Sequence, residues 1–377
     1  MKVPPRLYRG VQAVMERLPR GPRDAVAREA WVQYRRAHTL QHRLDYLFWE
    51  TTLRCNLQCA HCGSSCSPEP LPGELTTAEI DDALAGIARR QDPKTIMLVA
   101  SGGEPLVRED LLEVMGRAAR RGYRWGMVTN GLLVNDEMVD RLARAGMRTV
   151  SVSVDGTEEH HDGVRLREGS YRKALRALEA LQACPYFSIV EILTTLNRHN
   201  AGDLEHVLEL ALRLGVKAWR VGTVAPIGRA KDQPELWVTG EQLRAAMAFV
   251  QRHRGRHPGL DLSYACEGYT GERFEPHVRK HRFACWAGIR VGGILADGAV
   301  SACPDIPRHF VQGNIRDRDF MDLWEQEFQP FRDRRWMQVG DCAGCKQWRI
   351  CGGGGLHYFD PERGELQRCH ARLMGEL

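Results

Sequence analysis

The chain has 377 residues, of which 43% are hydrophobic and 27% are charged, with a formal net charge of +5. This balance is typical of a globular protein of roughly two or three domains and excludes a disordered chain. No apolar run reaches the ~18 residues that a membrane span needs, and the mild, spread charge argues against a nucleic-acid partner.

Residues 1–46 are rich in arginine, and short apolar steps between the charges predict helices. Their basic face is either a solvated surface or a docking surface for an acidic partner. The N-terminus is charged throughout and lacks the apolar stretch of a secretory signal. We therefore expect a cytoplasmic protein whose thiols stay reduced.

Residues 47–225 alternate strand and helix patterns six times. The continuous apolar run "TIMLVAS", for example, is typical of a strand buried on both faces. Strands joined by crossover helices form a parallel sheet, so we expect an α/β fold with a partial (β/α)6 barrel of the TIM type. The predicted strands cover residues 46–54, 95–101, 124–130, 148–156, 187–197 and 218–226.

The remainder of the chain has a less regular pattern. Residues 226–284 contain a loop, one helix and a polar stretch that bridge to the C-terminal part. Residues 285–377 are rich in glycine and cysteine and show only short strands. Such a segment is expected to depend on metal or cross-links for its order, so we predict a small Cys-rich domain that begins near residue 285.

Unusual polar or glycine-rich sequences follow each of the first five predicted strands. They are the cysteine-rich stretch "CNLQCAHC", then "SGGEP", "TNG", "SVDG" and "TTLN". The C-terminal ends of parallel strands meet at one edge of a sheet, where α/β folds carry their chemistry. We therefore expect these sequences to build one site.

Cys55, Cys59 and Cys62 form a C-x3-C-x2-C pattern on the loop after the first strand. Thiolates suit soft metals, either zinc or the iron of an iron–sulfur cluster. Structural zinc needs four protein ligands, usually in two separated pairs. Three thiols on one loop can instead hold three irons of a 4Fe–4S cluster and leave the fourth iron open. We interpret the nearby Cys66 as a bystander, because its ligation would close that iron.

This pattern resembles the signature of radical S-adenosylmethionine (SAM) enzymes, and the resemblance covers about residues 47–225. It implies that SAM binds the open iron and is cleaved to a 5′-deoxyadenosyl radical, which abstracts hydrogen from a substrate. The SAM-binding residues that the resemblance implies are Gly102, Gly103, Glu104, Ser153, Asp155, Arg165, Thr195, Asn197 and Arg220. Three of them have an alternative role that is only structural: Thr195 and Asn197 as caps of a strand end, and Arg220 in an ion pair.

The C-terminal cysteines resemble the SPASM extension of radical SAM enzymes that modify peptides and proteins. The resemblance implies an auxiliary 4Fe–4S cluster with a complete ligand set, whereas the spacing alone also allows zinc. A further auxiliary cluster of that family would use Cys285, Cys303 and a third thiol, whose place is taken here by Gly355. The complete ligand set consists of Cys342, Cys345, Cys351 and Cys369.

We therefore expect the second auxiliary site to be incomplete. Cys285 and Cys303 would form a reduced pair, or other ligands such as Cys266 or His281 would join them. Asp305 matches a position at which the family sometimes keeps a proton-accepting carboxylate. Its alternative role is that of a surface turn in "CPDIPR".

The resemblance predicts a radical SAM maturase that abstracts hydrogen from a peptide or protein side chain and so crosslinks or oxidises it. One alternative is the same chemistry on a small molecule in cofactor or natural-product biosynthesis. Another is an iron–sulfur electron carrier or scaffold without catalysis, which the intact "GGEP" and "SVDG" motifs disfavour. The expected partners are the substrate and an electron donor such as flavodoxin or ferredoxin.

Overall fold

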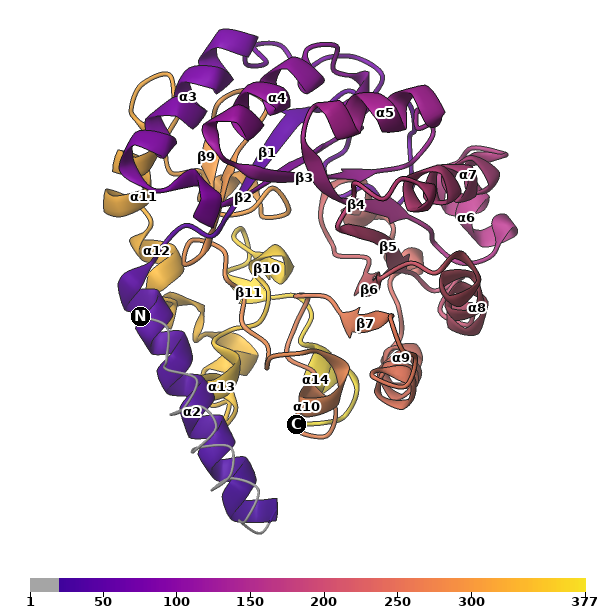
Figure 1. Cartoon of the computed structure of the whole chain (residues 1–377). Helices are drawn as coiled ribbons and strands as arrows, with labels where there is room; N and C mark the ends of the chain where they lie inside the picture. The colour runs from indigo at the N-terminus through magenta and orange to yellow at the C-terminus, as the bar shows by residue number, and fades with distance from the viewer. Residues whose placement is uncertain (1–19) are drawn as a thin grey trace, which may run out of the picture.

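The computed structural model describes residues 20–377 and contains an open, nine-stranded sheet that curves under a layer of helices (Figure 1). The strand order is β7-β6-β5-β4-β3-β2-β1-β8-β9. Neighbouring strands are parallel throughout, except that β9 runs antiparallel to β8. The strands of this sheet are β1 Tyr46–Thr52, β2 Met97–Gly102, β3 Arg124–Thr129, β4 Met147–Ser153, β5 Ile189–Leu196, β6 Ala218–Thr223, β7 Asp261–Tyr264, β8 Val291–Ile294 and β9 Val300–Ser301.

Helices connect the strands, and a two-stranded hairpin lies near the C-terminus. The helices are α2 Arg20–Gln41, α3 Thr77–Arg90, α4 Leu111–Arg121, α5 Asp136–Arg144, α6 Glu158–Arg165, α7 Ser170–Ala183, α8 Leu204–Leu214, α9 Gly240–His253, α10 Glu275–Val278, α11 Phe320–Gln326, α12 Gln329–Arg332, α13 Trp348–Cys351 and α14 His370–Leu373. The hairpin pairs β10, Phe359–Asp360, with β11, Glu365–Leu366. No helix among residues 20–377 is long and apolar enough to cross a membrane.

Local signals in the sequence set the helix boundaries. The Thr76 side chain accepts a hydrogen bond from the Glu79 amide, and the Glu79 carboxylate accepts one from the Thr76 amide, which together start α3. Gly122 ends α4 with a φ of 108°, a left-handed conformation that glycine adopts without strain. Each boundary thus has a local cause in the residues at that position.

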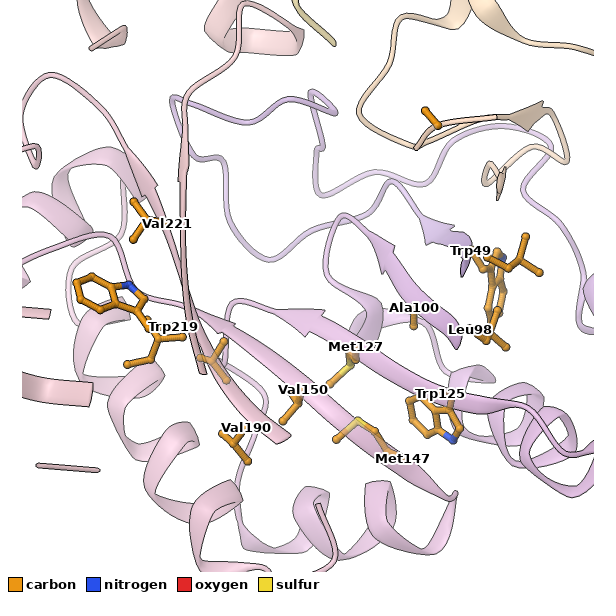
Figure 2. Close-up of a cluster of buried hydrophobic side chains, with 14 of the residues drawn as sticks. Trp49, Leu98, Ala100, Trp125, Met127, Met147, Val150, Val190, Trp219 and Val221 are labelled. Carbon is orange, nitrogen blue, oxygen red and sulfur yellow. The ribbon is translucent and has the colours of Figure 1, made fainter. Parts of the chain in front are cut away.

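The core lies between the sheet and the helices (Figure 2). Alternate strand residues such as Trp49, Trp125 and Trp219 are fully buried there. Burying each large apolar side chain contributes roughly 1.5–3 kcal/mol. The strand residues that alternate with these buried residues point to the inner face of the curved sheet. On that face, the Arg220 guanidinium forms an ion pair with Glu191 at 2.7 Å. The sheet therefore has an apolar outer face and a polar inner face.

The six predicted strands are confirmed, but the sheet is larger than predicted. The segment 226–284 contributes a seventh parallel strand, β7, whose four residues "DLSY" are too short and too polar to stand out in the sequence. At the other edge, β8 pairs in parallel with β1. The Cys-rich segment therefore contributes β8 and β9 to the central sheet, in addition to its own two-stranded hairpin. Helix α6, which carries Arg165, was not predicted either.

Helix α2 confirms the helical prediction for residues 20–41, while residues 1–19 lie outside the described residues. It extends along the Cys-rich part of the chain (Figure 1). The Arg35 guanidinium donates hydrogen bonds to the carbonyl oxygens of Ile350 at 2.6 Å and Arg349 at 2.7 Å. Trp31 packs edge-on against Trp286, with ring centroids 6.0 Å apart. The basic N-terminal helix thus docks on its own chain.

Candidate functional site

The loop of residues 55–66, here called the Cys loop, leaves the C-terminal end of β1 and carries the three predicted cluster ligands. Cys55, Cys59 and Cys62 are half-buried. Burial, together with the charge of Glu104 and the nearby thiols of Cys59 and Cys62, raises the pKa of Cys55 to about 11. Such crowded thiols lose their protons when a metal supplies positive charge, so the donor set fits an iron–sulfur cluster.

Cys66 is buried behind the three ligands. Its amide donates to the Cys62 sulfur over 3.5 Å. A hydrogen bond from the Cys66 thiol lowers the pKa of Cys62 to about 6 and raises the pKa of Cys66 itself. Cys66 is thus a hydrogen-bond partner of Cys62, and the prediction that it does not ligate the cluster stays a prediction.

Arg229, which the sequence analysis missed, holds the Cys loop in place. It follows β6, and its guanidinium donates to the carbonyl oxygens of Cys59 at 2.9 Å and Cys66 at 2.6 Å. Its backbone amide donates to the carbonyl of Cys62 at 2.9 Å. The remaining Nη2 is buried and has no hydrogen-bond partner among residues 20–377. The only signal in the sequence was its position directly after the sixth strand.

The "GGEP" turn packs against the end of β1. A Cβ atom on Gly102 would lie 2.4 Å from the carbonyl oxygen of Thr52, and one on Gly103 would lie 2.0 Å from the carbonyl oxygen of Arg54. Both distances are impossible for real atoms, so only glycine fits. The two glycines thus let the turn lie directly beside the start of the Cys loop.

The buried Glu104 carboxylate links this turn to the end of β3. Its Oε1 accepts a hydrogen bond from the Thr129 hydroxyl at 2.8 Å, and its Oε2 accepts one from the Asn130 amide at 2.8 Å. The Asn130 side chain then donates to Asn56 at 2.7 Å and lies 3.9 Å from the Cys55 sulfur. Burial raises the pKa of Glu104, although these hydrogen bonds partly oppose it.

Asp155 organises the predicted residues of β4, α6 and β5. It accepts hydrogen bonds from the Arg165 guanidinium at 2.8 and 3.0 Å and from the Thr195 amide at 2.8 Å. Asn200 donates to the carbonyl oxygens of Asp155 and Thr195 and accepts from the amide of Asn197. Burial raises the pKa of Asp155, but the neighbouring Arg165 and histidines outweigh it and lower the pKa overall.

Asp155 and the residues connected to it by hydrogen bonds, here called the Asp155 group, adjoin the Cys loop. The His61 Nε2 lies 3.6 Å from the Asp155 carboxylate, and the buried His61 Nδ1 has no partner among residues 20–377. The positive charge of Arg165 acts on Cys59, where it opposes the rise in pKa that burial causes. Ser153 lies half-buried at the last position of β4. The structure therefore brings the Cys loop, the "GGEP" turn and the Asp155 group together at one edge of the sheet.

Arg220 lies apart from that group. Its guanidinium contacts Glu191 at 2.7 Å and the Ser151 hydroxyl at 3.4 Å, in the middle of the strands and away from the loops. This contact is the structural ion pair that was one alternative in the sequence analysis. Its Nε is buried without a partner in the part of the chain described.

The four C-terminal cysteines predicted as auxiliary ligands line one small cavity. Burial, together with the nearby Cys369, raises the pKa of Cys342 to about 11 and the pKa of Cys351 to about 12. The Cys351 sulfur also accepts a hydrogen bond from the Gly354 amide at 3.2 Å. The complete predicted set thus faces a common space: Cys342, Cys345, Cys351 and Cys369.

Cys303 and Asp305 lie beside a larger cavity of about 380 Å³. The Cys303 sulfur is 4.0 Å from the Asp305 carboxylate. Asp305 lines the cavity together with residues 63–65 of the Cys loop, and burial raises its pKa. Burial, together with the positive charges of Lys280 and Arg290, lowers the pKa of His281, the other candidate substitute ligand. Its place in the second auxiliary site stays a prediction.

Two family models match the chain. The one described as "Radical SAM superfamily" matches residues 49–211, and the SPASM model, described as "Iron-sulfur cluster-binding domain", matches residues 285–346. The first match runs from β1 into helix α8 and so includes five of the six strands predicted for the barrel, while β6 follows it. The second begins at Cys285 and ends just after Cys345.

Curated relatives of two kinds are similar to this chain over most of their length. The AdoMet-dependent heme synthase of Methanosarcina barkeri is 31% identical over 329 residues, which cover 81% of this chain and 89% of the relative. The mycofactocin maturase MftC of Mycobacterium ulcerans is 34% identical over 325 residues, which cover 83% of this chain and 84% of the relative.

Solved structures share the fold at low sequence identity. Streptococcus suis SuiB bound to S-adenosylmethionine has a TM-score of 0.69 and 13% identity, over 89% of this chain and 80% of SuiB. The enzyme anSMEcpe with bound AdoMet and a peptide has a TM-score of 0.68 and 19% identity, over 89% of this chain and 95% of its own.

Proposed function

The chain belongs to the radical SAM superfamily and carries a SPASM domain, and we propose that it modifies a side chain of a peptide or protein substrate. The shape of its site and the peptide-modifying relatives support this proposal. The general radical reaction follows from the family. The substrate, the product and the role of each residue belong to the proposal.

Cys55, Cys59 and Cys62 would hold the 4Fe–4S cluster. When bound together, this cluster and SAM supply a 5′-deoxyadenosyl radical, after one electron arrives from a donor such as flavodoxin or ferredoxin. Arg229 keeps the Cys loop in its shape by binding three of its carbonyl oxygens. We place this chemistry in the cytoplasm, where thiols stay reduced.

The SAM-binding residues divide into two kinds. Gly102 and Gly103 bring the backbone of the turn close to the Cys loop, whereas Glu104 has no exposed atom. Its carboxylate serves to position Thr129 and Asn130. The second kind would contact SAM from the ends of β4 and β5 and from α6, and consists of Ser153, Asp155, Arg165, Thr195 and Asn197. Arg220 lies on β6, where it pairs with Glu191.

The cavity of about 380 Å³ is the proposed substrate site. Its size suits a single side chain or a small molecule. Asp305 stands at its wall with an exposed side chain, and the surrounding protein raises the pKa of its carboxylate above the ordinary value of an aspartate, which makes it a stronger base. After the substrate loses a hydrogen atom to the 5′-deoxyadenosyl radical, Asp305 would take up the proton that the substrate radical releases, and the remaining electron would pass to the auxiliary cluster that the four C-terminal cysteines would hold. The observation that carries this proposal is that one cavity joins the Cys loop to Asp305.

A small-molecule substrate is the second candidate. The similarity to the AdoMet-dependent heme synthase of Methanosarcina barkeri favours it, because this chain matches that relative over 89% of the relative's length. A non-catalytic role as an electron carrier or scaffold has no such support, because a carrier needs no SAM pocket.

Co-expression with candidate precursor peptides, followed by mass spectrometry, tests the proposed substrate class. We expect a mass loss of about 2 Da, or a crosslink in the fragmentation pattern, from a hydrogen-abstracting oxidation. The Asp305→Asn variant should reduce this product while SAM cleavage continues. An unmodified peptide together with a modified small molecule in the same extract would favour the second candidate.

A further inference from the structure

We infer that Glu50 determines which substrates the cavity accepts, because it donates a hydrogen bond to an uncharged carbonyl oxygen such as that of a peptide group. Glu50 lies on β1 and lines the cavity of about 380 Å³ that Asp305 also lines. The inference rests on the proposed function only in that this cavity is taken as the substrate site. It adds the chemical group that the substrate presents there.

The Glu50 side chain is held in one orientation between the strands on either side of β1. Its residue pairs in register with Ser101 of β2, and its Cγ lies 3.2 Å from the place that a Cβ atom on Gly102 would take. Its Oε1 accepts a hydrogen bond from the amide of Ala296, just beyond β8, at 3.1 Å. The carboxyl group is therefore fixed at the wall of the cavity.

The other oxygen of this carboxyl group has no partner in the described part of the chain. Glu50 is only 5% exposed, and the Ala296 amide supplies the one hydrogen bond that its carboxyl group receives from residues 20–377. Because Oε1 is occupied and the side chain lines the cavity, Oε2 is the atom that faces the empty space. A buried polar atom of this kind is stabilised when a ligand supplies the missing hydrogen bond.

The cations of the cavity lining do not pair with Glu50. The Arg308 guanidinium forms an ion pair with Asp297, and the Lys231 ammonium lies 3.9 Å from the Glu362 carboxylate. Burial of a carboxylate without a cation is costly, whereas burial of the neutral acid is not. The surroundings of Glu50 therefore favour its protonated form.

The pKa of Glu50 agrees with this assignment. Burial raises it to about 7, and the charges of Asp297 and Asp305 also raise it, while the Ala296 amide and Arg308 oppose the rise. A protonated carboxyl group has one O–H donor. Since Oε1 already accepts the hydrogen bond from the amide, the proton resides on Oε2 and is available to a ligand in the cavity.

The group that complements this donor is an uncharged acceptor. The Asp305 side chain is exposed at the same cavity, so a substrate carboxylate would meet a like charge there. A cationic group would instead require an ionised Glu50, which its burial opposes. Leu53, Leu295 and Ile306 form part of the remaining wall and suit the carbon atoms on either side of an amide.

Infrared difference spectroscopy of the anaerobically reconstituted protein tests the donor. At about pH 6, the wild type should show the carbonyl stretch of a protonated carboxyl group that Glu50→Gln lacks and that the exposed control Glu69→Gln retains. N-methylacetamide, used as the probe of a peptide group, should move this band to lower frequency. A missing band, or a band that the probe leaves unchanged, would overturn the inference.

Acetate and methylammonium test the other two chemistries on the same band. We expect neither to move it at the concentration at which N-methylacetamide does. Conversion of the Glu50 band to a carboxylate band by methylammonium would show that the site binds cations. A larger shift with acetate than with the amide would show that it binds carboxylates, and either result would overturn the inference.

Two substitutions of Glu50 measure the hydrogen bond itself. Glutamine keeps an acceptor for the Ala296 amide and places an N–H donor where the Oε2 proton lies, so at about pH 6 the dissociation constant for N-methylacetamide should stay within about twofold of the wild type. Methionine has a similar size but no donor, and Glu50→Met should weaken binding about five- to tenfold. A ligand-detected nuclear magnetic resonance titration gives these constants, and the iron content and circular dichroism spectrum show that each variant is folded.

The pH dependence of probe binding separates a donor from a merely structural residue. Binding to the wild type should weaken as Glu50 ionises between about pH 6 and about pH 8.5, whereas binding to Glu50→Gln should stay constant. Equal affinities of the wild type and Glu50→Met would contradict the role of Glu50. These measurements need neither SAM cleavage nor a peptide product, so a failure of the proposed function is distinguishable from a failure here.

Discussion

Arg229 donates a hydrogen bond from its Nε to the carbonyl oxygen of Cys59 over 2.9 Å, although 170 residues separate them. This contact joins the loop after the sixth strand to the loop after the first. The geometry of the Cys loop therefore depends on a residue outside the cysteine motif.

Replacement of Arg229 by alanine should loosen the Cys loop. The loss of hydrogen bonds to the carbonyl oxygens of Cys59 and Cys66 should cost about 1–3 kcal/mol locally. We expect lower iron retention at the SAM site after gel filtration, and faster bleaching in air. Lys231→Gln, an exposed change in the same loop, is the control and should behave as wild type. Equal retention in both variants would contradict the role of Arg229.

Gly103→Ala should disrupt the "GGEP" turn. Its Cβ would lie 2.0 Å from the Arg54 carbonyl oxygen, so the backbone must shift, at a cost of more than about 2 kcal/mol. Gly202→Ala is a matched control, because no atom lies within 4 Å of its Cβ. We expect a lower thermal midpoint and weaker SAM binding only for the first variant. Similar midpoints for the two variants would show that the turn is not tightly packed.

Glu50 should make stability depend on pH. Burial raises its pKa from 4.5 to about 7, so the folded protein holds a proton between these values that the unfolded chain releases. The stability that this proton contributes is complete below about pH 4.5 and is lost as the pH rises through about 7.

Glu50→Gln should therefore leave stability nearly unchanged at about pH 4.5 and raise it by up to about 3 kcal/mol at about pH 8. Urea unfolding of the two proteins across this range measures the difference, with the exposed Glu69→Gln as the control. A difference that does not grow with pH would contradict the buried, protonated state of Glu50.

Arg35 should tune the auxiliary cluster held by the C-terminal cysteines. Its guanidinium binds the carbonyl oxygens of residues 349 and 350, next to Cys351, and its charge interacts with that cysteine. A nearby cation favours the more negative, reduced cluster. Arg35→Gln should lower the midpoint potential, on the order of 60 mV for a tenfold change in a one-electron equilibrium. Arg36→Gln is the exposed control, and an equal shift in both variants would exclude a local effect.

The sequence was most informative where one signal is strong and local. The apolar runs and the alternation of strand and helix patterns predicted the six strands, and the C-x3-C-x2-C spacing predicted the Cys loop. The short edge strand β7 was missed, because half of its residues are polar. Contacts between distant segments have no local signal, which is why Arg229 was missed.

Release of 5′-deoxyadenosine tests the central claim most directly. The anaerobically reconstituted protein, incubated with SAM and a strong reductant, should form 5′-deoxyadenosine and methionine in equal amounts. The Cys55→Ala/Cys59→Ala/Cys62→Ala variant should form neither. A wild-type protein that carries a reduced 4Fe–4S cluster at this site and still leaves SAM intact would contradict the account.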